Sequence, residues 1–417
     1  MNMTEQNTIP KGWKKTTLGE VAEPSKQQWK PGDHDQRYLG LEHIEPNQLT
    51  ISGYGSSSEL ASNKFYFDIG DTLFGKLRPY FRKVWKAKFK GVCSTDIWVL
   101  KPRNDFDKDF LFYFVANPYF VNKSMGANIG THMPRADWHF LESTEWAVPP
   151  LSEQHAIAAV LSSFDDKIEL LREQNKTLEA TAQAIFKEWF VNFNFPNAQG
   201  RPYKASGGKM IDSEFGEIPK GWRVGRLGDE VETVLGGTPS TEKKEYWENG
   251  NIPWINSGKV NDFRIYEPTA YITEKALNDS ATKLMPKGTV VIAITGATLG
   301  QVSRLEIEST GNQSVIGIIP NDKFSSAYLF YWMLESVSKI INTATGGAQQ
   351  HINKNDVNNF DFILPSDDVL RKHWELVGPL VEKISSNCFQ IQTLSTLRDI
   401  LLPKLMKGEV RVKGFVK

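Results

Sequence analysis

A short stretch of the chain mixes basic and aromatic side chains in the way that a nucleic-acid surface requires. No acidic residue occurs between Asp71 and Asp96. Cations can pair with phosphates, and flat rings can lie against bases or sugars. A solvated pair of strands with alternating lysines would have the same composition, so two interpretations stay open. The residues concerned are Lys76, Arg78, Arg82, Lys83, Lys86, Lys88 and Lys90, with Phe74, Tyr80, Phe81, Trp85 and Phe89.

Polar side chains that could read base edges occur in both halves of the chain. Gln and Asn can pair with adenine through two hydrogen bonds and Arg can do so with guanine, whereas Lys more often holds phosphate. Loops also carry polar residues for structural reasons, so each candidate has a structural alternative. In the first half we predict DNA contacts from Lys76, Arg78, Tyr80, Arg82, Lys83, Asn128, Thr131, His132 and Arg135. In the second half we predict them from Thr295, Gln301, Gln313, Gln349, Gln350, His351, Asn353 and Lys354.

Motifs for catalysis and for cofactor binding are missing from the sequence. It contains no Gly-x-x-x-x-Gly-Lys sequence for nucleotide phosphates and no glycine-rich loop after a strand. Its histidines show no metal-ligand spacing. The run Asn117-Pro118-Tyr119-Phe120 lacks the second proline of an adenine methyltransferase signature, and we interpret it as a helix end. We therefore expect no catalytic residues, no metal and no cofactor in this chain.

Composition and charge narrow the classes of protein further. The 417 residues contain 49 Lys and Arg against 49 Asp and Glu, so only the uneven distribution of charge indicates a polyanionic partner. No apolar run approaches the roughly 18 residues of a membrane span, and the polar N-terminus is unlike a signal peptide. We expect a cytoplasmic location without membrane contact. Cys93 and Cys388 are too few for a disulfide framework and are predicted to be core residues.

The sequence repeats itself once. Ile9-Pro10-Lys11-Gly12-Trp13 returns as Ile218-Pro219-Lys220-Gly221-Trp222, and His132 with Asp137 matches His351 with Asp356. A repeat of about 210 residues is too long for a solenoid and indicates a duplicated domain. Strand-like and helix-like segments alternate within each copy, so the predicted class is α+β.

Each copy is followed by a long helical stretch with a heptad seam. Apolar residues alternate at spacings of four and three, and each seam contains one Asn, which favours a matching polar partner and fixes register. We expect the two helices to form an antiparallel coiled coil; the alternative is that each packs on its own globular unit. The seam residues are Ile157, Leu161, Phe164, Ile168, Leu171, Asn175 and Leu178, and Val377, Leu380, Ile384, Asn387, Ile391, Leu394 and Leu401.

These features together resemble the specificity subunit of type I restriction-modification systems over essentially the whole chain. The resemblance is carried by residues 150–154, 165–168 and 184–190, by the C-terminal run 401–410, and by the two Ile-Pro-Lys-Gly-Trp openings. It implies two similar α+β target recognition domains separated by the paired helices, with pseudo-two-fold symmetry. The implied parts are residues 1–150 and 218–364 as recognition domains, 151–193 and 365–410 as spacer helices, 194–217 as a linker and 411–417 as a tail.

The resemblance also implies a division of labour with other subunits. Each recognition domain would read one half of a split double-stranded DNA site, while the helices would set the gap and dock two modification subunits. Those subunits would bring S-adenosylmethionine, and separate restriction (motor-nuclease) subunits would use ATP and magnesium. Because the second half lacks the basic run, we expect an asymmetric target. Two alternatives are a coiled-coil scaffold that binds protein without reading DNA, and a complete nuclease-methyltransferase.

Overall fold

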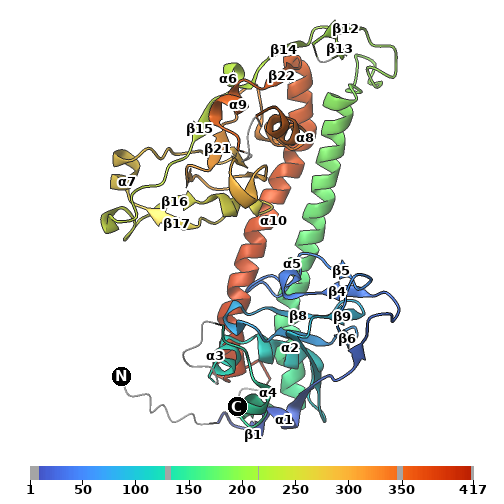
Figure 1. Cartoon of the computed structure of the whole chain (residues 1–417), viewed down its shortest axis with the longest axis vertical. Coiled ribbons are helices and arrows are strands. Elements are labelled where there is room, and N and C mark those ends of the chain that lie inside the picture. The colour runs from blue at the N-terminus through green and yellow to red at the C-terminus, as the bar shows by residue number, and fades with distance from the viewer. Residues whose placement is uncertain (1–8, 127–132, 215, 345–350, 415–417) are drawn as a thin grey trace. The chain divides into compact units, whose positions relative to one another are not determined.

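The computed structural model describes residues 9–126, 133–214, 216–344 and 351–414 (Figure 1). The chain divides into two compact units, and each is described by itself below. The first unit contains Met1–Glu169 and Gln392–Lys417, and the second contains Leu170–Ile391. The long helices α5 (Leu151–Phe186) and α10 (Asp367–Met406) therefore contribute residues to both units.

The first unit is built on a four-stranded sheet with the order β2-β10-β7-β8. A second sheet has the order β3-β6-β9-β4-β5, and β1 pairs with β11. Short helices follow the strands, and α2 packs against β7, β8 and β10. The strands are β1 (Lys14–Thr17), β2 (Ala22–Pro24), β3 (Gln28–Trp29), β4 (Arg37–Leu39), β5 (Gly55–Ser56), β6 (Lys64–Phe67), β7 (Thr72–Gly75), β8 (Val84–Lys86), β9 (Gly91–Cys93), β10 (Ile97–Pro102) and β11 (Glu145–Val148). The helices are α1 (Leu18–Val21), α2 (Lys108–Ala116), α3 (Pro118–Ser124) and α4 (Trp138–Glu142).

The second unit repeats this plan with a four-stranded sheet in the order β15-β21-β18-β19. Its β14–β22 pair corresponds to β1–β11, and its further sheet has the order β17-β16-β20. The strands are β12 (Met210–Ser213), β13 (Gly216–Pro219), β14 (Arg223–Arg226), β15 (Thr233–Leu235), β16 (Ile252–Ile255), β17 (Ala270–Ile272), β18 (Val290–Ala293), β19 (Val302–Arg304), β20 (Thr310–Gly311), β21 (Val315–Ile318) and β22 (Asp361–Leu364). The helices are α6 (Leu227–Glu230), α7 (Glu274–Asp279), α8 (Ser326–Ala344) and α9 (Lys354–Asn358).

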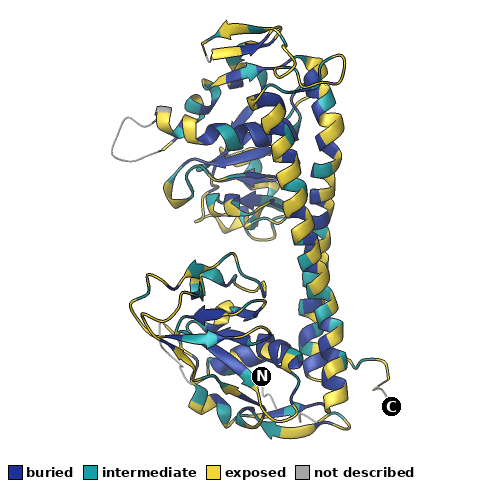
Figure 2. Ribbon diagram, turned by 90° about the vertical axis from the view of Figure 1, so that its right-hand side faces the viewer, coloured by how far each residue is buried: buried dark blue, intermediate teal, exposed yellow. Residues whose placement is uncertain are grey.

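The central strands of both units are buried on both faces. Every residue of β7 and of β18 is buried, and Figure 2 shows the dark blue strands inside each unit. A short apolar run bounded by turns is the pattern expected of such a strand. Cys93 and Cys388 are both free and buried, which confirms the expectation that they are core residues. The α+β class and its duplication are confirmed by the matching sheets.

The two long helices pair antiparallel within each unit. In the first unit Glu153 and Asp165 of α5 bind Arg411 and Arg398, so the two sequences run in opposite directions. In the second unit the seam asparagines meet: Nδ2 of Asn387 donates to Oδ1 of Asn175 at 2.9 Å. Both Asn side chains are buried, so this bond fixes the register as the seams predict. The alternative, in which each helix packs only on its own globular copy, is wrong.

The second seam is wider than the predicted one. Leu380, Leu394 and Leu401 are only half-buried, whereas Val381, Cys388 and Leu402, each one position after a predicted seam residue, are buried. Because 3.6 residues make one turn, a long straight helix drifts from a strict heptad, and adjacent positions share the contact face. The first helix changes character before the predicted boundary at residue 193, since α5 ends at Phe186 and a π-helical turn follows over Lys187–Val191.

Candidate nucleic-acid interface

Most of the described candidate residues lie on two loops that meet in each unit; Gln313 lies between β20 and β21, and Lys354 begins α9. One is the hairpin loop, which joins β7 to β8 (residues 76–83) and β18 to β19 (residues 294–301). The other is the capping loop, which precedes α4 (residues 133–137) and α9 (residues 351–353). In the first unit the backbone N–H of Arg78 donates to Pro134 and that of Ala136 donates to Lys76, both at 2.8 Å. In the second, Ile352 donates to Ile294 at 3.1 Å.

The hairpin loop of the first unit gathers cations near its surface. Lys76, Arg78 and Lys83 are half-buried, and Nζ of Lys83 donates to the carbonyl of Leu41 at 2.6 Å. Burial and the neighbouring Arg135 lower the pKa of Lys76. Arg135, from the capping loop, forms an ion pair with Asp96. Four of the predicted residues, Lys76, Arg78, Lys83 and Arg135, are thereby brought together with Tyr80, while Asn128, Thr131 and His132 lie outside the described residues.

Arg82 serves the structure of the first unit. Its side chain is 8% exposed, and its Nε donates to the carbonyl of Ala116 at 2.7 Å. Its Nη2 binds Asp399 of α10 at 2.9 Å. The guanidinium thus links the hairpin loop to α10, which makes Arg82 the least suited of the predicted residues to reach DNA.

The remaining cations of the basic run are neutralised within the unit. Lys86 pairs with Asp109 at 2.8 Å, Lys88 with Glu169 at 3.2 Å and Lys90 with Asp68 at 3.1 Å. Sequence proximity therefore overstated the length of the cationic surface. The charge available to phosphates is concentrated in the hairpin loop, because each of these later lysines is paired with a carboxylate.

The second unit presents mainly neutral polar groups at the same place, with Lys354 as the one cation among its described candidates. Thr295 lies beside Ser314, with their hydroxyl oxygens 2.8 Å apart, and the next residue back, Gln313, pairs with Thr238. Gln301 is exposed, and its backbone carbonyl accepts from Ala293 at the end of β18. His351 is exposed, and Lys354 opens α9. Thr295, Gln301, Gln313 and His351 thus belong to one end of the sheet, and Gln349 and Gln350 lie outside the described residues.

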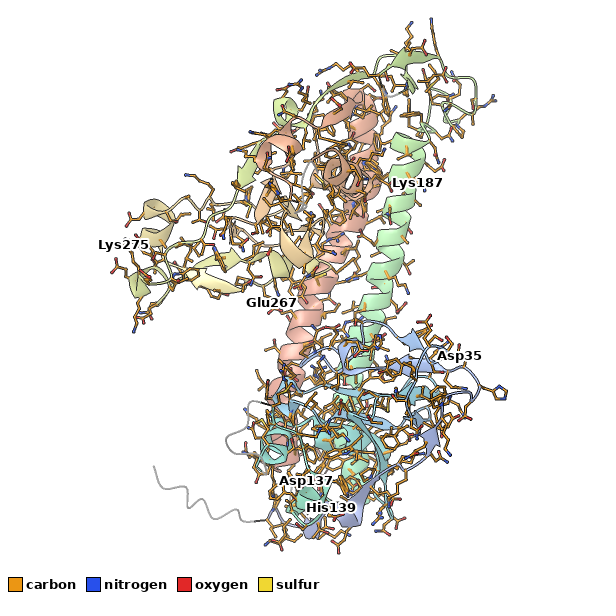
Figure 3. All side chains as sticks on the ribbon, in the orientation of Figure 1. Asp35, Asp137, His139, Lys187, Glu267 and Lys275 are labelled. Carbon is orange, nitrogen blue, oxygen red and sulfur yellow. The ribbon has the colours of Figure 1, made fainter. Side chains whose placement is uncertain are left out.

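Asn353 has a capping role that its sequence context did not reveal. Its side chain accepts the backbone N–H groups of Asn355 and Asp356, and Asp356 bonds back to Asn353. In the first unit Asp137 is the N-cap of α4, and its side chain accepts the backbone N–H of His139 (Figure 3). The structural counterpart of Asp137 is therefore Asn353, and the proposed match of His132 and Asp137 with His351 and Asp356 is out of register. The run from Asn117 behaves as interpreted, since Asn117 ends α2 and caps α3.

A clamped arginine on the first unit was missed by the sequence prediction. Arg37 at the start of β4 is exposed, and its guanidinium lies 5.0 Å from the ring centre of Tyr54 and 4.9 Å from that of Phe89. Stacked arginines keep their N–H edge free for a base or phosphate. Arg37, Tyr54 and Phe89 are far apart in the sequence, so no local motif relates them. The one available signal was the strand-like pattern of β4 and β5, which pair with each other.

Buried ionic groups attach each globular part to the long helices. In the first unit the hydroxyl of Tyr113 donates to Asp165 at 2.6 Å, and Asp165 also binds Arg398 at 2.6 Å. In the second, Arg264 binds Glu179 of α5 at 2.5 Å. Glu306 accepts from Arg304 and from Ser385 of α10, each at 2.6 Å. Burial next to these carboxylates raises the pKa of Tyr113 and that of Tyr331.

The described residues contain no group of His, Cys, Asp and Glu side chains arranged to hold a metal ion. Within the same described ranges, no helix is long and apolar enough to cross a membrane.

Comparisons with known proteins agree with the duplicated architecture. Residues 10–180 and 219–393 each match the family described as type I restriction modification DNA specificity domain. The chain is 31% identical to the type I restriction enzyme MjaIX specificity subunit of Methanocaldococcus jannaschii, covering 75% of this chain and 71% of that protein. It is 26% identical to the HindI specificity subunit of Haemophilus influenzae, covering 82% and 86%.

A solved structure supports the fold. The S subunit of a type I restriction-modification system from M. genitalium superposes with a TM-score of 0.54 over 97% of this chain and 98% of that chain, at 17% identity. Two matched copies, together covering most of the sequence, show the family. This chain belongs to the type I restriction-modification DNA specificity family.

Proposed function

We infer that this chain is the sequence-reading subunit of a type I restriction-modification complex, in which each unit reads one half of a split DNA site. The observation that carries this inference is the duplication of the specificity domain, with a hairpin loop and a capping loop meeting in both copies. The family match favours this function over a protein scaffold that does not read DNA. A cytoplasmic location follows from the proposed DNA substrate.

We further propose that the chain has no catalytic role of its own. Two modification subunits would dock on the helices and supply S-adenosylmethionine, and restriction subunits would use ATP and magnesium. The paired helices would set the unread gap between the half-sites. Because the hairpin loops differ in charge, the two half-sites should differ, and the target should be asymmetric.

A domain exchange tests this function. Replacing residues 1–149 with the matching segment of a relative should change one half-site and leave the other half-site and the gap unaltered, since distant sites contribute additively. Methylation mapping in cells that carry the hybrid complex reports both half-sites and the gap between them. The matched control replaces the same residues with the segment of a relative that reads the same target, and it should leave both half-sites and the gap unchanged. A hybrid that changes both half-sites or the gap would contradict independent reading.

A further inference from the structure

Two exposed aromatic rings stand at the tip of the hairpin loop in the first unit. Tyr80 is 44% exposed and Phe81 is 37% exposed, and their ring centres lie 4.7 Å apart. Large apolar side chains are usually buried, and an exposed pair on a loop indicates a binding surface. The equivalent loop of the second unit has Thr298 and Leu299 at its tip, and Leu299 packs against the core.

The backbone holds this tip in an uncommon conformation. The 3-10 turn Pro79–Phe81 lies between Arg78 and Arg82, which both adopt left-handed backbone angles with φ of 51° and 47°. Residues other than glycine pay for such angles, and surrounding structure must hold them in place. Here the carbonyl of Phe81 accepts from the N–H of Asn47 at 3.1 Å, and the buried Arg82 is tied to α10. The aromatic tip is thus rigid before any partner binds.

The charge around the tip selects the class of partner. Lys76, Arg78 and Lys83 belong to the same loop, and the stretch from Thr72 to Thr95 has no acidic residue. Cations next to flat rings suit a polyanion whose bases offer stacking surfaces. A partner protein that docked by apolar contact alone would have no need of these cations.

We propose that Tyr80 and Phe81 form a wedge that enters one base step of the bound duplex and unstacks it, while the flanking cations hold the phosphates. Apolar side chains inserted at a base step unstack it and bend the duplex, which changes the local shape of the DNA. This inference rests on the proposed function and extends it. It assigns the two residues a DNA-deforming role in addition to any direct contact with a base edge.

The test uses the full-length chain, assembled with the modification subunits of its own system, and a duplex containing its mapped target. 2-Aminopurine replaces adenines one at a time in the half-site assigned to the first unit. With the unaltered protein, fluorescence should rise at one step other than the adenine that is methylated, because 2-aminopurine brightens when it is unstacked and a methyltransferase takes its target base out of the stack in any case. The double variant Tyr80→Ala, Phe81→Ala should lose that signal, and affinity should fall about 5- to 100-fold for each ring that stacks.

Matched variants separate this inference from the function on which it rests. Tyr80→Phe and Phe81→Tyr should keep the fluorescence signal, and so should Tyr271→Ala, which removes a similarly exposed tyrosine on β17 of the second unit. If Lys76→Ala and Lys83→Ala weaken binding but the double aromatic variant binds and brightens like the unaltered protein, the wedge is wrong and DNA reading stands. If the double variant fails to assemble with the modification subunits, the tip is a protein contact. If no variant changes DNA binding, the proposed function of this loop falls as well.

Discussion

The hairpin loops of the two units share a backbone arrangement and differ in chemistry. The first has a rigid aromatic tip with cations, and the second has hydroxyl and amide groups, including Thr295 and Gln301. Both loops receive a backbone hydrogen bond from the residue before a helix N-cap, Ala136 or Ile352. The comparison teaches that the scaffold of sheet and capping loop is kept while the surface it presents is exchanged.

The attachment to the helices differs in a second way. In the first unit Asp165 and Arg398 pair between α5 and α10. The equivalent strands β11 and β22 begin at residues 145 and 361, so equivalent positions in the two copies differ by 216 residues. The position equivalent to Asp165 is Val381, and the position equivalent to Arg398 is Ala182; both are buried apolar residues. The second unit instead recruits Arg264 and Glu306, whose side chains are almost fully buried. These charged groups are therefore shielded from water, and removing one of them should lower the free energy of unfolding more than removing Asp165 or Arg398 would.

The largest effect is expected from breaking that buried cluster. Arg264→Met leaves the carboxylates of Glu179 and Glu306 without this partner, and uncompensated buried charge costs about 3–5 kcal/mol. Urea unfolding of the second unit, followed by the fluorescence of its tryptophans, measures the loss. Lys275→Met is the matched control, because Lys275 on α7 pairs with Glu245 at the exposed surface, where solvent screens the ion pair, and its loss should change stability far less (Figure 3). Equal effects of the two variants would contradict the comparison.

The next effect depends on pH and involves His373. Its side chain is fully buried in the second unit against Phe186, Trp189 and Phe190, and burial lowers its pKa to about 4. In the unfolded chain the imidazole of His373 takes up a proton below about pH 6.5, whereas in the folded chain it does so only near pH 4. The stability contribution is therefore complete above pH 6.5 and is lost as the pH falls to about 4, by about 3 kcal/mol.

Exchange of His373 for its counterpart tests this assignment. The same 216-residue offset gives Ile157, which is buried in the first unit. His373→Ile should flatten the stability of the second unit between pH 6.5 and 4, as measured by urea unfolding at a series of pH values. Trp374→Ile, at the exposed neighbouring position, should leave the slope intact. A slope that persists in His373→Ile would assign the acid sensitivity to another group.

The smallest effect concerns salt and separates the two hairpin loops. Lys76→Ala in the first unit should reduce the slope of log affinity against log salt by about 1, because one phosphate contact is lost. Gln301→Ala in the second unit should leave that slope unchanged and alter base preference instead. Binding of the assembled complex to target and mismatched duplexes at several salt concentrations measures both. If Gln301→Ala lowered the slope as much as Lys76→Ala, the two loops would not differ in the way described.

Periodic and duplicated features were predictable from the sequence, and long-range pairings were not. The seam spacing predicted the meeting of Asn175 and Asn387, because the heptad pattern repeats over many turns. The partners of Arg264 and Arg82 were hidden, since such ion pairs join residues that no local pattern relates. Matching His132 to His351 by residue type failed. The helices that follow them, α4 and α9, begin at residues 138 and 354, which are 216 positions apart, whereas the two histidines are 219 positions apart.

The division of the chain into units has a consequence for its synthesis. The second unit is one continuous segment, Leu170–Ile391, whereas the first also requires Gln392–Lys417. Leu402, Leu405 and Met406 belong to the hydrophobic cluster of the first unit, together with Trp13 and Ile157. On the ribosome, the unit that begins to emerge first is thus completed last. A nascent chain that stops after Ile391 has all of the second unit and leaves the first with an uncovered apolar surface, which marks it for chaperones and proteases.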